Sequence, residues 1–187
     1  MSANWDRCYR RHFGSYFGKP FDVQTYRPGA DSPPLQLATF DQPYPGYRVY
    51  ASVGLTAYEA DVKALGEVIL LADTAWKDVP FLFINALFFA VQHNIPLTSR
   101  FAIGVAGLMP AFAEQFDKAA LYFTLADGFP EGFEKVECDG EAGLVLQALF
   151  ISEAEHELLK RQGPTVLEER LHGQEADLCS LLRPSSV

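Results

Sequence analysis

The feature that most constrains the fold is an apolar segment near the middle of the chain. Residues Val79–Val91 read VPFLFINALFFAV, thirteen residues that Gln92 and His93 then interrupt. A helix that crosses a bilayer needs roughly twenty apolar residues, so this segment is too short to span a membrane. Because it is apolar on every side, it predicts a helix buried inside a folded domain. The 187-residue chain must supply the layers around that helix, which favours one domain with one core.

Periodic patterns predict the strands of such a layer. Segments Pro34–Phe40 and Gly46–Leu55 alternate apolar and polar residues on either side of a proline-rich turn at residues 41–45, which predicts an antiparallel pair. Residues Leu65–Ala72 are almost continuously apolar, as a central strand would be, and residues Ala119–Ala126 predict another strand.

The first half of the chain also contains segments that are less regular. Asn4 can cap a first helix, and the turn-forming residues from Gly18 to Pro34 predict a loop after it. Segment Phe101–Phe116 is rich in Ala, Leu and Phe but is interrupted by glycines and a proline. It predicts either a short strand or a turn of helix that covers the core.

The last third carries stronger local signals. Asp139-Gly140, between two apolar segments, is the strongest two-residue signal for a β-hairpin. Ser152-Glu-Ala-Glu155 predicts a capping box at the start of a helix, which Gly163-Pro164 would end. Thr165-Val-Leu-Glu168 predicts a second capping box, and residues Arg183–Val187 are expected to fray.

These elements predict an α+β fold, a single domain in which helices pack against a mainly antiparallel or mixed β-sheet. We expect residues 1–33 to form an N-terminal helix and loop, residues 34–172 the α+β domain, and residues 173–187 a C-terminal tail.

The cysteines indicate a reducing environment. Cys8, Cys138 and Cys179 are odd in number, lie far apart and show no paired spacing, which argues against both a disulfide framework and a zinc site. The first residues, MSANWDRCYRRHF, have no apolar core of the kind found in a signal peptide. We therefore expect a cytoplasmic protein with free thiols.

The charge is concentrated in one part of the chain. The net charge is −9, and residues 127–177, with thirteen acidic and four basic residues, account for all of it. Such a surface repels nucleic acids and anionic membranes and attracts a basic protein partner, although it could also serve only to keep the protein in solution. The candidate partner-binding residues lie around the predicted hairpin: Glu131, Glu134, Glu137, Asp139 and Glu141.

No common catalytic or cofactor-binding motif is present in the sequence. His156 lies three residues after Glu153, a spacing that could place two metal ligands on one helix face, but a di-iron site needs this motif twice. A reactive cysteine would need a cationic or histidine neighbour, which sequence alone does not reveal. We therefore predict no catalytic residue, cofactor or metal, and an enzyme with a site near His156 or a cysteine stays open as an alternative.

Four stretches, taken in order, resemble the suppressor-of-fused (SUFU) domain. They are Tyr50–Glu59, which contains a GLT signature; the strand Gly66–Leu71; the helix Phe81–Asn94; and the closing strand Leu144–Ile151, which runs into Ser152–Glu155 and continues to Leu171. The resemblance covers roughly Pro34 to Leu171.

The resemblance implies a fold and a role. Eukaryotic members of the family are two-domain regulators that hold a transcription-factor peptide between their lobes, and this chain resembles only the N-terminal domain. Short bacterial members resemble immunity proteins that neutralise a cognate toxin. The resemblance therefore implies a non-catalytic protein-binding module, with an immunity protein as its most specific form. A structural homo-oligomer, built through an exposed sheet edge, is the further alternative.

Overall fold

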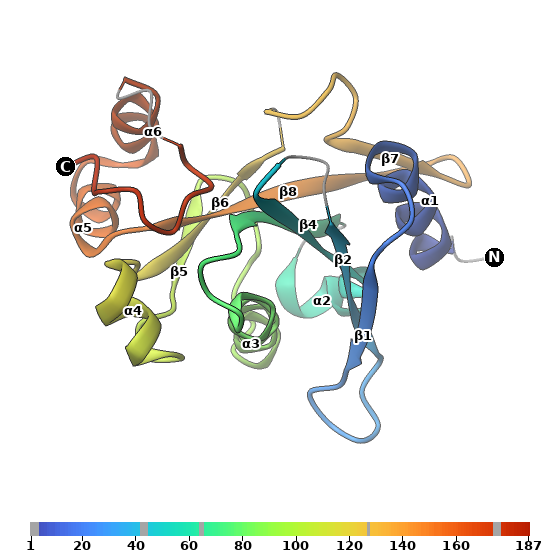
Figure 1. The fold of residues 1–187 in the computed structure, drawn as a ribbon. Coiled ribbons are helices and arrows are strands. Elements are labelled where there is room, and N and C mark those ends of the chain that lie inside the picture. The colour runs from blue at the N-terminus through green and yellow to red at the C-terminus, as the bar shows by residue number, and fades with distance from the viewer. Residues whose placement is uncertain (1–3, 42–44, 64–65, 127, 174–176) are drawn as a thin grey trace.

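The computed structural model describes residues 4–41, 45–63, 66–126, 128–173 and 177–187. Part of the predicted turn at 41–45, the first residue of the predicted strand Leu65–Ala72, and the acidic residues Asp127 and Glu175 lie outside the described residues. Within the described part, one mixed β-sheet is covered by helices on both faces (Figure 1). The predicted single-domain α+β fold is confirmed.

Within the part of the chain that the structure describes, the sheet has eight strands, and most neighbours are antiparallel. Its order is β1-β2-β3-β4-β8-β6-β5, with β7 paired to the first part of β8. The one parallel pair among the described strands is β4 with β8. The strands are β1 (Asp22–Tyr26), β2 (Leu35–Asp41), β3 (Tyr47–Val53), β4 (Gly66–Asp73), β5 (Phe101–Gly104), β6 (Ala120–Leu125), β7 (Lys135–Cys138) and β8 (Glu141–Ile151).

The helices divide between the two faces. They are α1 (Trp5–Phe17), α2 (Glu59–Val62), α3 (Val79–Gln92), α4 (Pro110–Phe116), α5 (Glu153–Gln162) and α6 (Pro164–Gly173), with a 3-10 turn at Leu55–Tyr58. Alternate residues of β8 show the division, because successive side chains of a strand point to opposite faces. Leu146 and Phe150 pack in the cluster that contains α3, whereas Val145 packs with residues of α1, and Ile151 packs with residues of α6.

The apolar segment is a buried helix, as predicted. Eight residues of α3, among them Leu82, Phe83 and Leu87, are buried against the strands around it. Before its last residue, the exposed Gln92, the one polar side chain of the helix is Asn85, which is half-buried. Within the described residues no helix is long and apolar enough to span a membrane.

Strands β6 and β7 together form one interrupted partner of β8. Residues 146–151 of β8 pair with β6, and residues 141–144 pair with β7. Between the two strands, residues 128–134 leave the sheet and bring Phe129 and Phe133 under α1. The two rings stack there with their centroids 4.6 Å apart. Because of this excursion, the same edge of β8 pairs with β6 over one part of its length and with β7, in a hairpin, over another.

The hairpin prediction is confirmed. Asp139 has φ 52° and Gly140 has φ 89°, both in the left-handed region that a two-residue hairpin turn requires. The capping box at Ser152 and Glu155 is also confirmed, and α5 ends at Gly163 as predicted.

Three local predictions need correction. The predicted loop Gly18–Pro34 contains β1, a five-residue strand that exists because β2 pairs with it. Segment Phe101–Phe116 contains both a strand and a helix, β5 and α4. The second capping box is wrong, because α6 already begins at Pro164 and the Thr165 hydroxyl instead accepts a hydrogen bond from Arg100 at 2.6 Å.

Candidate functional site

The predicted acidic residues gather on and beside the β7–β8 hairpin, which reaches past α1 at one side of the molecule (Figure 1). Glu137, Asp139 and Glu141 are exposed on the hairpin itself. Glu131 is exposed on the excursion that precedes β7, whereas Glu134 is half-buried. The five residues therefore share one region, and three of them form its outermost part.

A disulfide bond holds this hairpin against α1. Cys8 of α1 and Cys138 of β7 are bonded, with Cα atoms 5.8 Å apart. A hydrogen bond of 2.9 Å from the Tyr9 hydroxyl to the carbonyl of Leu144 adds a second connection between α1 and β8. The prediction that the cysteines form no disulfide is wrong for this pair. Its partners are 130 residues apart, so no local spacing could reveal them.

Gly143 permits the close approach of α1. A Cβ atom at this position would overlap the Tyr9 hydroxyl and would lie 2.9 Å from the Trp5 ring. Tyr9 is fully buried, and burial, together with the nearby Glu67 carboxylate, raises its pKa. The Tyr9 hydroxyl therefore stays protonated and keeps its hydrogen bond to the strand.

The surface around the hairpin carries both signs of charge. Arg7, Arg10 and Arg11 of α1 are exposed. Arg11 and Glu137 line the same hollow of about 270 Å³, together with Cys8. The acidic hairpin is thus bordered by a basic helix, an arrangement that a partner with a matching charge pattern could recognise.

The residues considered for catalysis are not brought together. Burial lowers the pKa of His156, and no described group of three His, Cys, Asp or Glu side chains could hold a metal. Cys179 is the one free thiol among the described cysteines. Burial, followed by the neighbouring Asp177 carboxylate, raises the pKa of Cys179 to about 12. The thiol is therefore protonated at neutral pH and is a poor nucleophile.

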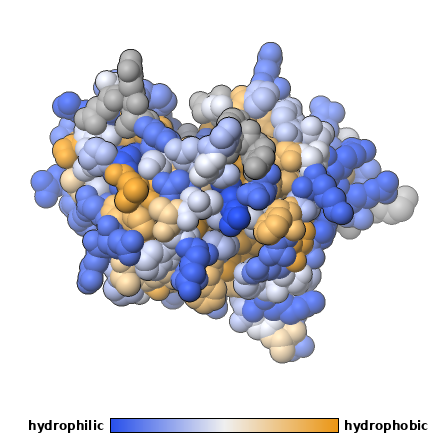
Figure 2. All heavy atoms as spheres, viewed as in Figure 1, coloured by the Kyte–Doolittle hydropathy of each residue, from blue (hydrophilic) through white to orange (hydrophobic). Residues whose placement is uncertain are grey.

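A groove of about 520 Å³ lies on the face of the sheet that also carries α1. Its floor includes Tyr122 of β6 and Gln147 of β8, and its walls include Phe129 on one side and Leu171 of α6 on the other. Figure 2 shows the surface hollowed at its upper edge, between α6 and the segment that follows β6. No local pattern in the sequence predicts this groove, because its lining comes from distant parts of the chain.

One end of the groove is closed by a polar network around Glu168. Arg100 donates two hydrogen bonds to its carboxylate, at 3.2 and 2.8 Å, and the Tyr122 hydroxyl donates a third at 2.7 Å. Burial and the carboxylate of Glu168 raise the pKa of Tyr122. The network neutralises its own charges, so it shapes the groove without offering an unpaired charge to a ligand.

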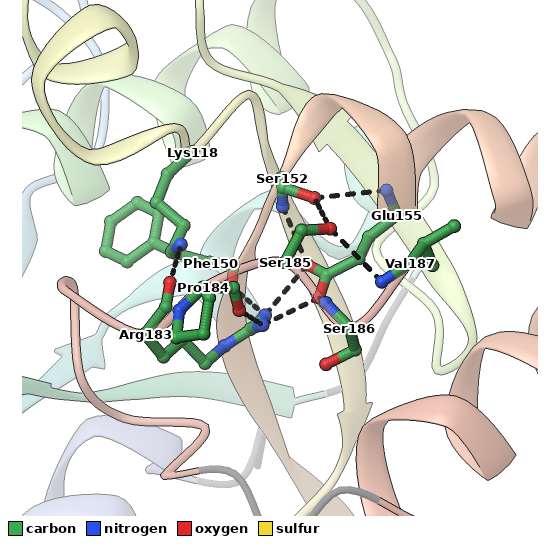
Figure 3. Close-up of polar contacts among 9 residues, drawn as sticks. All are labelled: Lys118, Phe150, Ser152, Glu155, Arg183, Pro184, Ser185, Ser186 and Val187. Atoms are coloured by element: carbon green, nitrogen blue, oxygen red, sulfur yellow. Dashed lines mark hydrogen bonds and ion pairs between the residues drawn. The ribbon is translucent and has the colours of Figure 1, made fainter.

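The C-terminal segment is fixed at its end by a buried ion pair (Figure 3). The guanidinium of Arg183 donates to both carboxylate oxygens of Glu155, at 2.6 and 2.9 Å, and to the carbonyl of Phe150 at 3.0 Å. The backbone N–H of Ser186 donates to the same carboxylate at 2.8 Å. The prediction that residues 183–187 fray is therefore wrong.

A second anchor lies earlier in the same segment. The carboxylate of Asp73, at the end of β4, accepts hydrogen bonds from the Ser180 hydroxyl at 3.0 Å and from the Leu181 N–H at 2.9 Å. Between these anchors and α6, Leu178 and Cys179 line the groove. The C-terminal segment therefore forms part of the groove wall.

Comparison with models of known protein families identifies the family of this chain. The family model described as "Suppressor of fused protein (SUFU)" matches residues 31–184, most of the chain. The chain belongs to the suppressor of fused family. No curated protein matches it.

Two solved structures of this fold cover almost the whole chain. A putative SUFU homolog from Neisseria gonorrhoeae FA 1090 has a TM-score of 0.75 at 15% identity, over 98% of this chain and 97% of its own. A chain of the structure titled "the Sufu-Fu complex crystal structure" has a TM-score of 0.66 at 12% identity, over 97% of this chain and 92% of its own. At these identities the likeness establishes the fold.

Two of the segments that resemble the SUFU domain meet at Glu67, which is fully buried. Its carboxylate accepts hydrogen bonds from the Ser52 hydroxyl at 2.6 Å and from the N–H groups of Gly54 and Thr56 at 2.8 and 3.3 Å. Burial raises the pKa of Glu67 to about 7. Gly54 and Thr56, in the GLT signature, thus fix the loop after β3 to β4, which gives this signature a structural role.

Proposed function

We propose that this SUFU-family chain is a non-catalytic protein-binding module whose partner docks on the β7–β8 hairpin. The observation that carries the proposal is the exposure of Glu137, Asp139 and Glu141 on a hairpin tied to α1 by the Cys8–Cys138 bond. A rigid surface loses little conformational entropy when it binds, so such a hairpin can present its carboxylates in a fixed pattern. The solved Sufu-Fu complex, in which a chain of this fold takes part, supports a protein partner.

The partner we propose is a basic protein, and the most specific form of the proposal is an immunity protein that neutralises a toxin. Complementary charge accelerates association and makes it sensitive to salt. The exposed arginines of α1 favour a partner that places an acidic or neutral segment beside its basic surface. This second contact would distinguish a cognate partner from any basic protein.

The test is a pull-down from the host lysate at low and moderate salt, followed by binding of the purified captured protein. The hairpin variant carries Glu137→Lys, Asp139→Lys and Glu141→Lys. The matched control carries Glu59→Lys, Glu114→Lys and Glu169→Lys, three exposed acidic residues on other elements. We expect the hairpin variant to lose the partner and the control to keep it. Equal binding by both variants would refute the hairpin as the docking surface.

The cytoplasmic location stays a prediction, and the structure gives a reason to test it. Disulfides persist mainly in oxidising compartments, whereas cytoplasmic thiols are kept reduced. Protein isolated from its host under thiol-blocking conditions should be analysed by mass spectrometry. A blocked Cys8 would indicate a reducing compartment, and an intact Cys8–Cys138 bond an oxidising one.

A further inference from the structure

The first strand of the sheet has an open edge. β1 pairs with β2 on one side, and no described strand pairs with its other side. Figure 1 shows it at the margin of the sheet, far from β5 at the opposite end. In a strand, the N–H and C=O groups of alternate residues point to each edge, so β1 presents unpaired backbone groups to solvent.

This edge lacks several of the features that prevent pairing between molecules. Natural edge strands are protected by being very short, by charged side chains, above all lysine, by proline or by a bulge. β1 is short and has one charged residue, Asp22. β1 reads DVQTY, with neither lysine nor proline, and its register with β2 is continuous over all five residues. Its apolar residue Val23 is 42% exposed, and Phe21, directly before the strand, is 67% exposed.

The sequence of β1 is complementary to itself in an antiparallel arrangement. Pairing centred on Gln24 places Gln24 opposite its own copy, Asp22 opposite Tyr26, and Val23 opposite Thr25. No like charges then face each other, and the β-branched residues lie side by side, which favours cross-strand contact. A two-fold axis through this centre keeps the α1 face of both sheets on the same side.

A hollow of about 230 Å³ lies beside the edge on that face. It is lined mainly by apolar side chains, including Val23 of β1, Phe13 of α1 and Phe40 of β2. In the paired arrangement the Val23 and Thr25 side chains of a second copy would extend over the same face. The contact would thereby cover apolar surface as well as satisfy backbone groups.

We propose that two copies of this chain associate through antiparallel pairing of their β1 strands. The occupant of the edge is a second copy because the strand is self-complementary. Pairing of β1 with the distant β5 edge would instead be head-to-tail and would build rings or open chains. The contact is short, so the dimer forms at high protein concentration and dissociates on dilution.

Gln24 provides a specific test, because it faces itself across the axis. Gln24→Lys and Gln24→Glu each place like charges opposite one another, and an equimolar mixture of the two places opposite charges there. Gln115→Lys, at an exposed position on α4, is the matched control. Circular dichroism and thermal unfolding confirm that each variant is folded.

Sedimentation or light scattering over concentrations up to the millimolar range gives the mass. We expect the wild-type protein and the Gln115→Lys control to approach twice 20.8 kDa. Each Gln24 variant alone should dimerise at least about tenfold more weakly, and their mixture should recover the dimer. A wild-type mass that stays at 20.8 kDa, a dimer that neither Gln24 variant weakens, or assemblies larger than two copies would each overturn the proposal.

Discussion

Replacing Arg183 with methionine tests how firmly the C-terminal segment is held. The side chains of Arg183 and Glu155 are 3% and 0% exposed, so the substitution leaves a buried carboxylate without its cation. Removing one partner of a buried ion pair costs about 3–5 kcal/mol. For a chain of this size the same loss lowers the melting temperature by roughly 6–20 °C.

Urea unfolding at pH 7 measures this loss as a change in midpoint. Lys160→Met is the matched control, because Lys160 pairs with Glu157 on the exposed side of α5, and it should leave the midpoint almost unchanged. A double change, Arg183→Met with Glu155→Gln, should recover part of the stability because a neutral amide then replaces the buried carboxylate that lost its partner. A loss below ~1 kcal/mol for Arg183→Met would refute the buried ion pair and favour a frayed end.

The same pair predicts a pH dependence. Burial alone would raise the pKa of Glu155, but hydrogen bonds from Arg183 and from the backbone of Ser152 lower it below its ordinary value of 4.5. The ionised pair therefore contributes stability that is present above pH 4.5 and is lost as the pH falls through the lowered pKa. The difference between the wild-type protein and Arg183→Met should be largest near pH 7 and should shrink as the pH falls below 4.5.

Two further predictions concern the scaffold. Glu67→Gln should become more stable relative to the wild-type protein as the pH rises from 4.5 to about 7, by roughly 3 kcal/mol in total. The reason is that, in this range, the folded wild-type protein keeps a proton on Glu67 that the unfolded chain releases. Urea midpoints that move in parallel for both proteins would contradict the raised pKa of Glu67. Gly143→Ala should destabilise the protein by about 1–3 kcal/mol, because the new methyl group collides with α1. Gly173→Ala is the control, because Gly173 has open space around it and the change should not destabilise the protein. Equal melting temperatures for the two variants would show that α1 does not pack closely on β8.

Local signals in the sequence identified the elements that depend on few residues. Asp139-Gly140 specifies its hairpin because both positions adopt positive φ, and Ser152 and Glu155 specify their cap because they bond each other three residues apart. The apolar segment Val79–Val91 identified α3 because only a buried position suits a helix without a polar side.

The missing elements depend on contacts between distant residues. β1 escaped prediction because an exposed edge strand shows no alternation of burial and takes its structure from β2. The pair Arg183–Glu155 escaped because its members are 28 residues apart, and an arginine near a chain end suggests solvent exposure. The Glu155 carboxylate thus serves both the local helix cap with Ser152 and the distant ion pair with Arg183.

The candidate site was partly predictable for the same reason. Exposure of Glu137, Asp139 and Glu141 follows from their place on a hairpin. Their basic neighbour α1 could not be inferred, since the disulfide that places it there joins residues 8 and 138. Nor could the groove, whose floor and walls combine β6, β8, α6 and the C-terminal segment.

The central claim is that the hairpin is the partner-binding surface, and calorimetric titration of the purified partner tests it most directly. The wild-type protein should bind more weakly as salt is raised, and the Glu137→Lys, Asp139→Lys, Glu141→Lys variant should lose at least about tenfold in affinity together with most of that salt dependence. Wild-type affinity and an unchanged salt dependence in this variant would contradict the claim and place the binding surface elsewhere on the molecule.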